Sequence, residues 1–221
     1  MGGSSARIHA PFALLIAVAI GFSVWSFVGA GDRATWFFEL IFGWAGVIVL
    51  AATYRRFRFS WLAYLVCALF FVILSFGARY TYEETPIFNW LKEHFHLARN
   101  YSDRLGHFFQ GVVPALLSRE LLVRTTAIAR GFWTVFVPLA AALAVSAFYE
   151  LIEMWWVWAF YPARGPEWLG MQGDIWDAQW DMTMALLGGL FVVVLLARLH
   201  DRALMQVAQQ GNSKPETRNP K

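Results

Sequence analysis

The sequence predicts an all-α protein, a polytopic bundle of about six transmembrane helices with an additional helix at the membrane interface. Three observations support this class. Of the 221 residues, 58% are hydrophobic and only 15% are charged, whereas soluble domains carry about a quarter charged residues. The apolar residues form runs of about 20, which is long enough for a helix to cross a bilayer. Ionisable residues cluster where these runs begin or end. We therefore expect one integral membrane domain over residues 1–200.

The first three predicted spans are close together in the chain, with short connections. The first run is longer than the roughly 7–15 residues of a signal-peptide core, so we expect a retained helix. The loop between the second and third runs is short enough that it favours an antiparallel helix pair. These spans cover residues 8–29, 35–53 and 59–78.

The other three spans carry more distinctive features. The fourth opens with acidic and basic residues, and the fifth ends in a Trp-rich stretch that is typical of an aromatic belt at the water interface. The sixth contains Gly188-Gly189, which favours close contact with another helix. These spans cover residues 103–123, 132–160 and 176–198.

Two polar segments complete the predicted layout. Residues 86–98 have helical spacing of apolar positions, which indicates either a helix lying at the membrane interface or an ordered loop. Residues 201–221 are polar and are expected to form a disordered cytoplasmic tail.

The distribution of basic residues predicts the orientation. If the N-terminus is cytoplasmic, twelve of the 18 lysines and arginines fall on the cytoplasmic side. The positive-inside rule then places both termini in the cytoplasm of a bacterial inner membrane. The six basic residues on the other side are Arg33, Arg79, Lys92, Arg99, Arg104 and Arg164.

Three groups of ionisable residues then fall at the outer face. Spacings of three or four residues put the members of each group on one face of a helix. Because charge near hydrocarbon is costly, such groups normally face a bundle interior, a watery cavity or a partner. We therefore predict a shared polar pocket, which Arg104, Gln110, Gln172 and Gln179 could also join. The groups are Asp103 with His107, Glu150 with Glu153, and Asp177 with Asp181, preceded by Asp174.

Two chemical interpretations of this pocket remain open. The first is a divalent cation site, since carboxylates suit magnesium, calcium or manganese and an imidazole also suits zinc. Its candidate ligands are Asp103, His107, Glu150, Glu153, Asp177 and Asp181. The second is acid/base catalysis, because crowded carboxylates shift one another's protonation. Its candidate catalytic residues are Asp103, His107, Glu150 and Asp181.

A structural interpretation competes with both. Buried charges can simply pair and fix helix packing, and Asp174 and Asp177 can be solvated loop residues or helix caps. Other charged residues look ordinary. We expect Glu39 near the outer interface, Glu120 in a local pair with Arg119, and His200 at the surface.

Segments 99–111, 149–153 and 173–182 together resemble the YjdF-like family of bacterial inner-membrane proteins. They read RNYSDRLGHFFQG, YELIE and GDIWDAQWDM. This resemblance implies a membrane fold and assigns no reaction. A remoter similarity to VanZ-like proteins implies a role in the cell envelope. In that family the position of Glu153 usually holds Gln.

The preferred hypothesis is an envelope enzyme or a binder of lipid head groups, assisted by a metal ion. The expected partners are the bilayer and a lipid or envelope-precursor ligand. The alternative is a non-catalytic protein, either a small transporter or an accessory protein whose charges hold its helices together. Nucleic acid is not an expected partner, because the net charge is only +3 and no basic domain is present.

Overall fold

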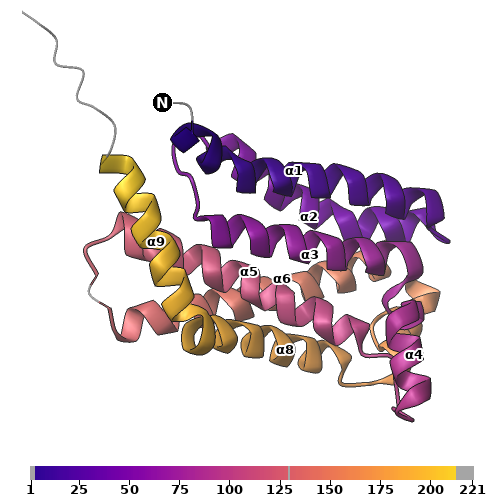
Figure 1. Ribbon diagram of the computed structural model, residues 1–221. Coiled ribbons are helices and arrows are strands. Elements are labelled where there is room, and N and C mark those ends of the chain that lie inside the picture. The colour runs from indigo at the N-terminus through magenta and orange to yellow at the C-terminus, as the bar shows by residue number, and fades with distance from the viewer. Residues whose placement is uncertain (1–2, 129, 213–221) are drawn as a thin grey trace, which may run out of the picture.

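The computed structural model describes residues 3–128 and 130–212, and they form a bundle of long helices (Figure 1). Within these ranges there is no strand. The long helices are α1 (Gly3–Gly29), α2 (Arg33–Thr53), α3 (Trp61–Tyr80), α5 (Ser102–Thr125), α6 (Phe132–Phe160) and α8 (Asp177–Phe191). A π-helical segment, η4 (Val192–Leu196), joins α8 to α9 (Ala197–Asn212). The short elements are η1 (Tyr82–Glu84), α4 (Pro86–His94), η2 (Pro162–Arg164), α7 (Gly165–Trp168) and η3 (Met171–Gly173).

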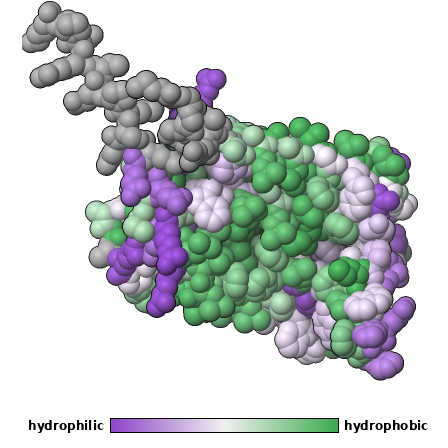
Figure 2. Space-filling model, viewed as in Figure 1, coloured by the Kyte–Doolittle hydropathy of each residue, from purple (hydrophilic) through white to green (hydrophobic). Residues whose placement is uncertain are grey.

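The bundle is a helical membrane protein, as predicted. Among the residues that the structure describes, five helices are long and apolar enough to cross a membrane: α1, α2, α3, α6 and the continuous α8–α9 helix. Helix α5 is the remaining predicted span. It carries several charged residues and packs against α3, α6 and α8. Figure 2 shows a broad hydrophobic band across the middle of the molecule, with hydrophilic residues at both ends.

Two hydrophobic cores divide the bundle. Leu15 of α1, Leu40 of α2 and Phe71 of α3 belong to the first. The second lies where α3, α5, α6 and η4 meet, and includes Val112 and Ala142. In Figure 1, α1, α2 and α3 form one layer and α5, α6 and α8 the other. Helices α3 and α5 are in contact and connect the layers.

The predicted close contact at Gly188-Gly189 is confirmed. A Cβ atom on Gly188 would lie 2.0 Å from the backbone oxygen of Phe108, and one on Gly111 would lie 1.9 Å from the backbone oxygen of Ala185. Each glycine therefore lets the backbones of α5 and α8 approach closely. This approach brings the N-terminal ends of the two helices together, where the acidic residues lie.

The segment after the third span is helical, as one of the two interpretations predicted. Helix α4 starts at Pro86, and proline is favoured at the first helical position. Its apolar residues Ile87 and Trp90 are exposed. At the other end of the chain the helix continues through Asn212, so the first part of the expected tail is helical. Residues 213–221 lie outside the described part.

Glu120 and His200 contradict the expectation that they are ordinary charges. Both are fully buried. Glu120 Oε1 accepts from the backbone N of Ser60 at 2.7 Å, and Oε2 lies 3.2 Å from His200 Nε2. Glu120 forms its ion pair with Arg124 at 2.7 Å, while Arg119 pairs with Asp201 at 2.9 Å. These bonds join α3, α5 and α9, and hydropathy alone could not reveal them.

Candidate functional site

The candidate site lies where the N-terminal ends of α5 and α8 meet, opposite the Glu120 end of the bundle. Arg104 of α5 is buried at its centre and contacts four carboxylates. Its Nη2 lies 2.6 Å from Asp177 Oδ1 and 3.2 Å from Asp174 Oδ2. Its Nη1 lies 3.2 Å from Asp103 Oδ2 and also pairs with Asp181 Oδ1. The fork of guanidinium donors suits this arrangement, because one planar group serves several oxygens.

Arg99 provides a second cation at the α8 end of the site. It lies 3.0 Å from Asp174 and 3.2 Å from Asp177. The other oxygen of Asp177 accepts from the backbone N of Met171 at 2.9 Å. Asp177 is therefore fully engaged within the protein. Asp174 is a loop residue rather than the cap of α8, whose capping position is Trp176. Its side chain is 26% exposed, pairs with both arginines and accepts from the backbone N of Trp176 at 2.9 Å.

Gln172 also has a structural role. Its side chain exchanges two hydrogen bonds with the backbone of Asn100, each of 2.9 Å. This clamp joins the loop before α8 to the loop before α5. It holds the loop that carries Arg99 in place without contributing a group to the site itself.

His107 lies one helical turn beyond Asp103 and has two distinct sides. Its Nε2 lies 3.5 Å from Asp103 Oδ1 and 3.7 Å from Asp181 Oδ2. Its Nδ1 lies 2.7 Å from Gln110 Oε1 and 3.7 Å from Glu150 Oε1. An amide oxygen can only accept, so Nδ1 carries a proton. Nε2 then faces two carboxylate oxygens, and this contact is favourable only with a proton or a cation between them.

Of the six candidate metal ligands, the structure brings three together. One ligand atom each from Asp103, His107 and Asp181 lie within 4.8 Å of one another, and all three residues are buried. The hydrogen bond from Nδ1 to Gln110 is the kind of support that orients metal-binding histidines. Glu150 faces the other ring nitrogen, and its Oε1 is buried without a hydrogen-bond partner.

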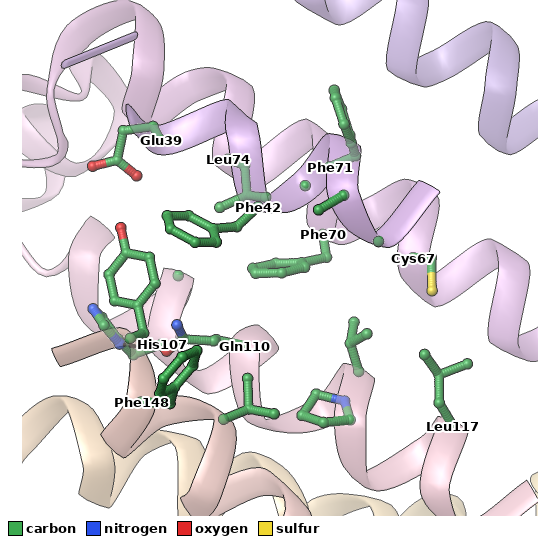
Figure 3. Close-up of a pocket in the computed structure, with 18 of the residues that line it drawn as sticks. Glu39, Phe42, Cys67, Phe70, Phe71, Leu74, His107, Gln110, Leu117 and Phe148 are labelled. Carbon is green, nitrogen blue, oxygen red and sulfur yellow. Dashed lines mark hydrogen bonds between the residues drawn. The ribbon is translucent and has the colours of Figure 1, made fainter. Parts of the chain in front are cut away.

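A cavity of about 610 Å³ extends from this site between α2 and α3 on one side and α5 and α6 on the other. Figure 3 shows Glu39 and His107 at one end and Cys67 and Leu117 at the other. Polar groups gather at the first end, where Asp103, His107, Glu153 and Asp181 line it. The rest of the wall is largely aromatic and aliphatic, and includes Phe42, Phe70, Leu74, Phe148, Leu117 and Leu121.

Glu39 is the functional candidate that sequence reasoning missed. It was expected to be an ordinary residue near the outer interface, but it lines the polar end of the cavity. Tyr82 and Tyr149 line the same cavity, and each carries a hydroxyl that can donate to a carboxylate. Burial raises the pKa of Tyr82 well above its ordinary value, so that hydroxyl stays a donor. A carboxylate within an apolar span was the signal that could have identified Glu39.

Comparison with known proteins gives a family but no reaction. Residues 11–202 match the model of a family described as "Predicted membrane protein (DUF2238)". The chain is also 42% identical over 181 residues to the inner membrane protein YjdF of Escherichia coli K12. That alignment covers 82% of this chain and 86% of the relative. No solved structure matches the chain significantly.

Proposed function

The chain belongs to the DUF2238 family of predicted membrane proteins, which includes multi-pass inner membrane proteins of the YjdF type, and we propose that it binds a long-chain amphiphile. In this proposal the head group lies at the Asp103, His107 and Glu39 end of the cavity, and the hydrocarbon chain lies along the apolar remainder. The observation that carries the proposal is the continuous cavity with one polar end.

The size of the cavity supports this class of ligand. Small-molecule sites usually measure about 300–1,000 Å³, and this cavity measures about 610 Å³. Its lining on α2 extends from Glu39 to Thr53. At about 1.5 Å per residue this separation is about 21 Å, longer than one leaflet of a hydrocarbon core about 30 Å thick. An extended chain fits such a length better than a compact solute.

The orientation predicted from the basic residues supports a ligand from the outer leaflet. With both termini cytoplasmic, the polar end of the cavity lies at the periplasmic side of the inner membrane. The α9 end carries Arg119, Arg124 and Arg130 and would face the cytoplasm. We therefore propose that the protein receives its ligand from the outer leaflet, among lipids or lipid-linked envelope precursors.

Gly46 allows a direct test. It lines the cavity, and a Cβ atom there would meet nothing within 4 Å. Gly46→Leu should fill the cavity without a clash, and it replaces a helix-destabilising glycine with a good helix former. The test is to quantify, by mass spectrometry, the amphiphile that co-purifies in mild detergent. We expect about one molecule per wild-type chain and a several-fold loss in Gly46→Leu.

Gly21→Leu is the matched control. Gly21 also has nothing within 4 Å of its Cβ position, but it lies on α1 outside the cavity. It should retain the wild-type amount of amphiphile. Equal amounts in wild type and Gly46→Leu would contradict the proposal.

A second candidate function is a divalent cation site, and the geometry of His107 favours it. Nε2 and two carboxylate oxygens converge while Nδ1 is held by Gln110. Asp103, His107 and Asp181 would hold the ion. A bound ion at this position would polarise an ester or phosphate oxygen of the head group. The two functions are compatible, because the same residues line the polar end of the cavity.

A further inference from the structure

Apart from Glu150, which lies beside His107, the acidic residues at the polar end of the cavity fall into two groups with different partners. The first group, the aspartates Asp103, Asp174, Asp177 and Asp181, is paired with Arg104, and two of them also with Arg99. The second group consists of Glu39 on α2 and Glu153 on α6. Both line the cavity, and neither forms an ion pair with a cation among residues 10–128, 130–166 and 168–209. Two cavity-facing carboxylates thus have no ion-pair partner among these residues, and His107 is the positive group within electrostatic range of both.

Glu39 and Glu153 also interact unfavourably with each other. They come from different helices, but Phe42, one turn after Glu39, packs its ring 5.4 Å from that of Tyr149, one turn before Glu153. Both glutamates therefore face the same part of the cavity, where a charge on one opposes a charge on the other. Two carboxylates in one cavity are costly unless a proton or a bound cation neutralises them. His107 is already engaged with Asp103, Asp181 and Gln110, so it is poorly placed to fill this role.

Aromatic groups complete the surroundings of the two glutamates. Tyr149 lines the cavity one turn before Glu153 on α6, and its ring packs against that of Phe42 on α2. Tyr82 and Phe42 also line this part of the cavity. Aromatic faces together with carboxylates form the usual recognition site for an ammonium group. An ammonium also supplies three hydrogen-bond donors, which suits a site rich in acceptors.

We infer, on the basis of the proposed function, that the head group of the bound amphiphile carries an ammonium that sits between Glu39 and Glu153. An anionic head would face these carboxylates, and the arginines nearby are already occupied by aspartates. The cavity should therefore bind amine-headed amphiphiles in preference to alkyl phosphates and fatty acids.

The test is a series of amphiphiles with one chain length and three head groups. Dodecylammonium, dodecanol and dodecyl phosphate are added below their micellar concentrations to the protein in a non-ionic detergent. Binding is followed by titration calorimetry. A charge-assisted hydrogen bond contributes about 1.5–3 kcal/mol, so dodecylammonium should bind at least about tenfold more tightly than dodecanol. Dodecyl phosphate should bind more weakly than dodecanol.

Two variants assign the preference to these residues. The double variant Glu39→Gln with Glu153→Gln keeps the shapes and removes both charges. It should reduce the preference for dodecylammonium over dodecanol to less than about threefold. The control, Glu83→Gln with Glu93→Gln, removes the same charge from exposed residues at the same end of the molecule. It should retain the wild-type preference.

The outcomes separate the inference from the proposed function. If dodecanol and dodecylammonium bind equally well and Gly46→Leu abolishes both, the cavity binds amphiphiles but the inference is wrong. A preference for dodecyl phosphate would also overturn the inference alone. If none of the three binds, both the inference and the proposed function fail.

Discussion

Arg104 on α5 forms a buried ion pair with Asp181 on α8, although 77 positions separate them in the chain. Their meeting depends on the close approach of the two helices at Gly111 and Gly188. The ion pair holds one Asp181 oxygen, which leaves the other directed at His107. The packing of α5 against α8 therefore also sets the geometry of the site.

Arg104→Met should destabilise the protein strongly. The guanidinium contacts four carboxylates, and its side chain is only 8% exposed. Removing one partner of a buried ion pair costs about 3–5 kcal/mol, because the remaining charge is left uncompensated. The free energy of unfolding in detergent is the measurement. Arg124→Met, which breaks a pair at the opposite end where the arginine is more exposed, is the comparison. A loss of less than about 1 kcal/mol in Arg104→Met would argue against a central role.

Gly188→Ala should also be destabilising, for a steric reason. The added Cβ would lie 2.0 Å from the backbone oxygen of Phe108, so α5 and α8 must move apart. Overpacking of this kind typically costs about 1–3 kcal/mol. Gly21→Ala, where the new Cβ meets nothing within 4 Å, should be neutral or slightly stabilising. Thermal unfolding of the two variants distinguishes them, and equal melting temperatures would mean that the helices are not in tight contact.

Glu120→Ala should weaken the other end of the bundle without affecting the cavity. The carboxylate accepts from both the backbone N and the hydroxyl of Ser60, and it contacts Arg124 and His200. Its loss leaves buried donors unpaired, at a cost of about 1–3 kcal/mol for each. Protease sensitivity of the segment that joins α5 to α6 should rise. Amphiphile content should stay at the wild-type value, and a parallel loss of amphiphile would show that the two ends are not independent.

If the cation site is real, the metal content of the purified protein should depend on His107. The protein purified in mild detergent should hold about one divalent cation, measured by mass spectrometry of the elements. His107→Ala and Asp181→Asn should each abolish binding. Gln110→Ala should weaken it by about 10–100-fold, the usual effect of losing the group that orients a ligand.

His94→Ala is the control for that experiment, because His94 is an exposed histidine on α4. It should bind as much metal as the wild type. If the wild type holds no metal after incubation with magnesium, manganese or zinc, the cation site is contradicted. A proton on His107 Nε2 would then account for its contact with the two aspartates.

The sequence predicted the six long helices because helices depend on local patterns. Apolar runs mark the spans, and the four-residue spacing of Asp103 and His107 places them on one helical face. Gly188-Gly189 indicated where a neighbouring helix would pack. The resemblance to the YjdF-like family agrees with the family match.

Glu39 and His200 show where prediction from sequence fails. Each is a single ionisable residue in or beside a span, and nothing in its own helix indicates a partner. Glu39 reaches the cavity only because α2 packs beside α3 and leaves a gap toward α6. His200 is buried only because α9 packs against α3 near the start of that helix. Such contacts are set by the packing of helices distant in sequence.

The most direct test of the central claim, an amphiphile inside the cavity, is photochemical mapping. A dodecylammonium with a diazirine at the tip of its chain is incorporated into membranes containing the protein, and cross-linked peptides are identified after irradiation. The account predicts adducts concentrated inside the cavity and away from its polar end, at Leu50, Cys67 and Leu117. Adducts spread evenly over exposed apolar residues such as Val24 and Val194 would contradict it, because that pattern marks lipid on the outer surface of the bundle.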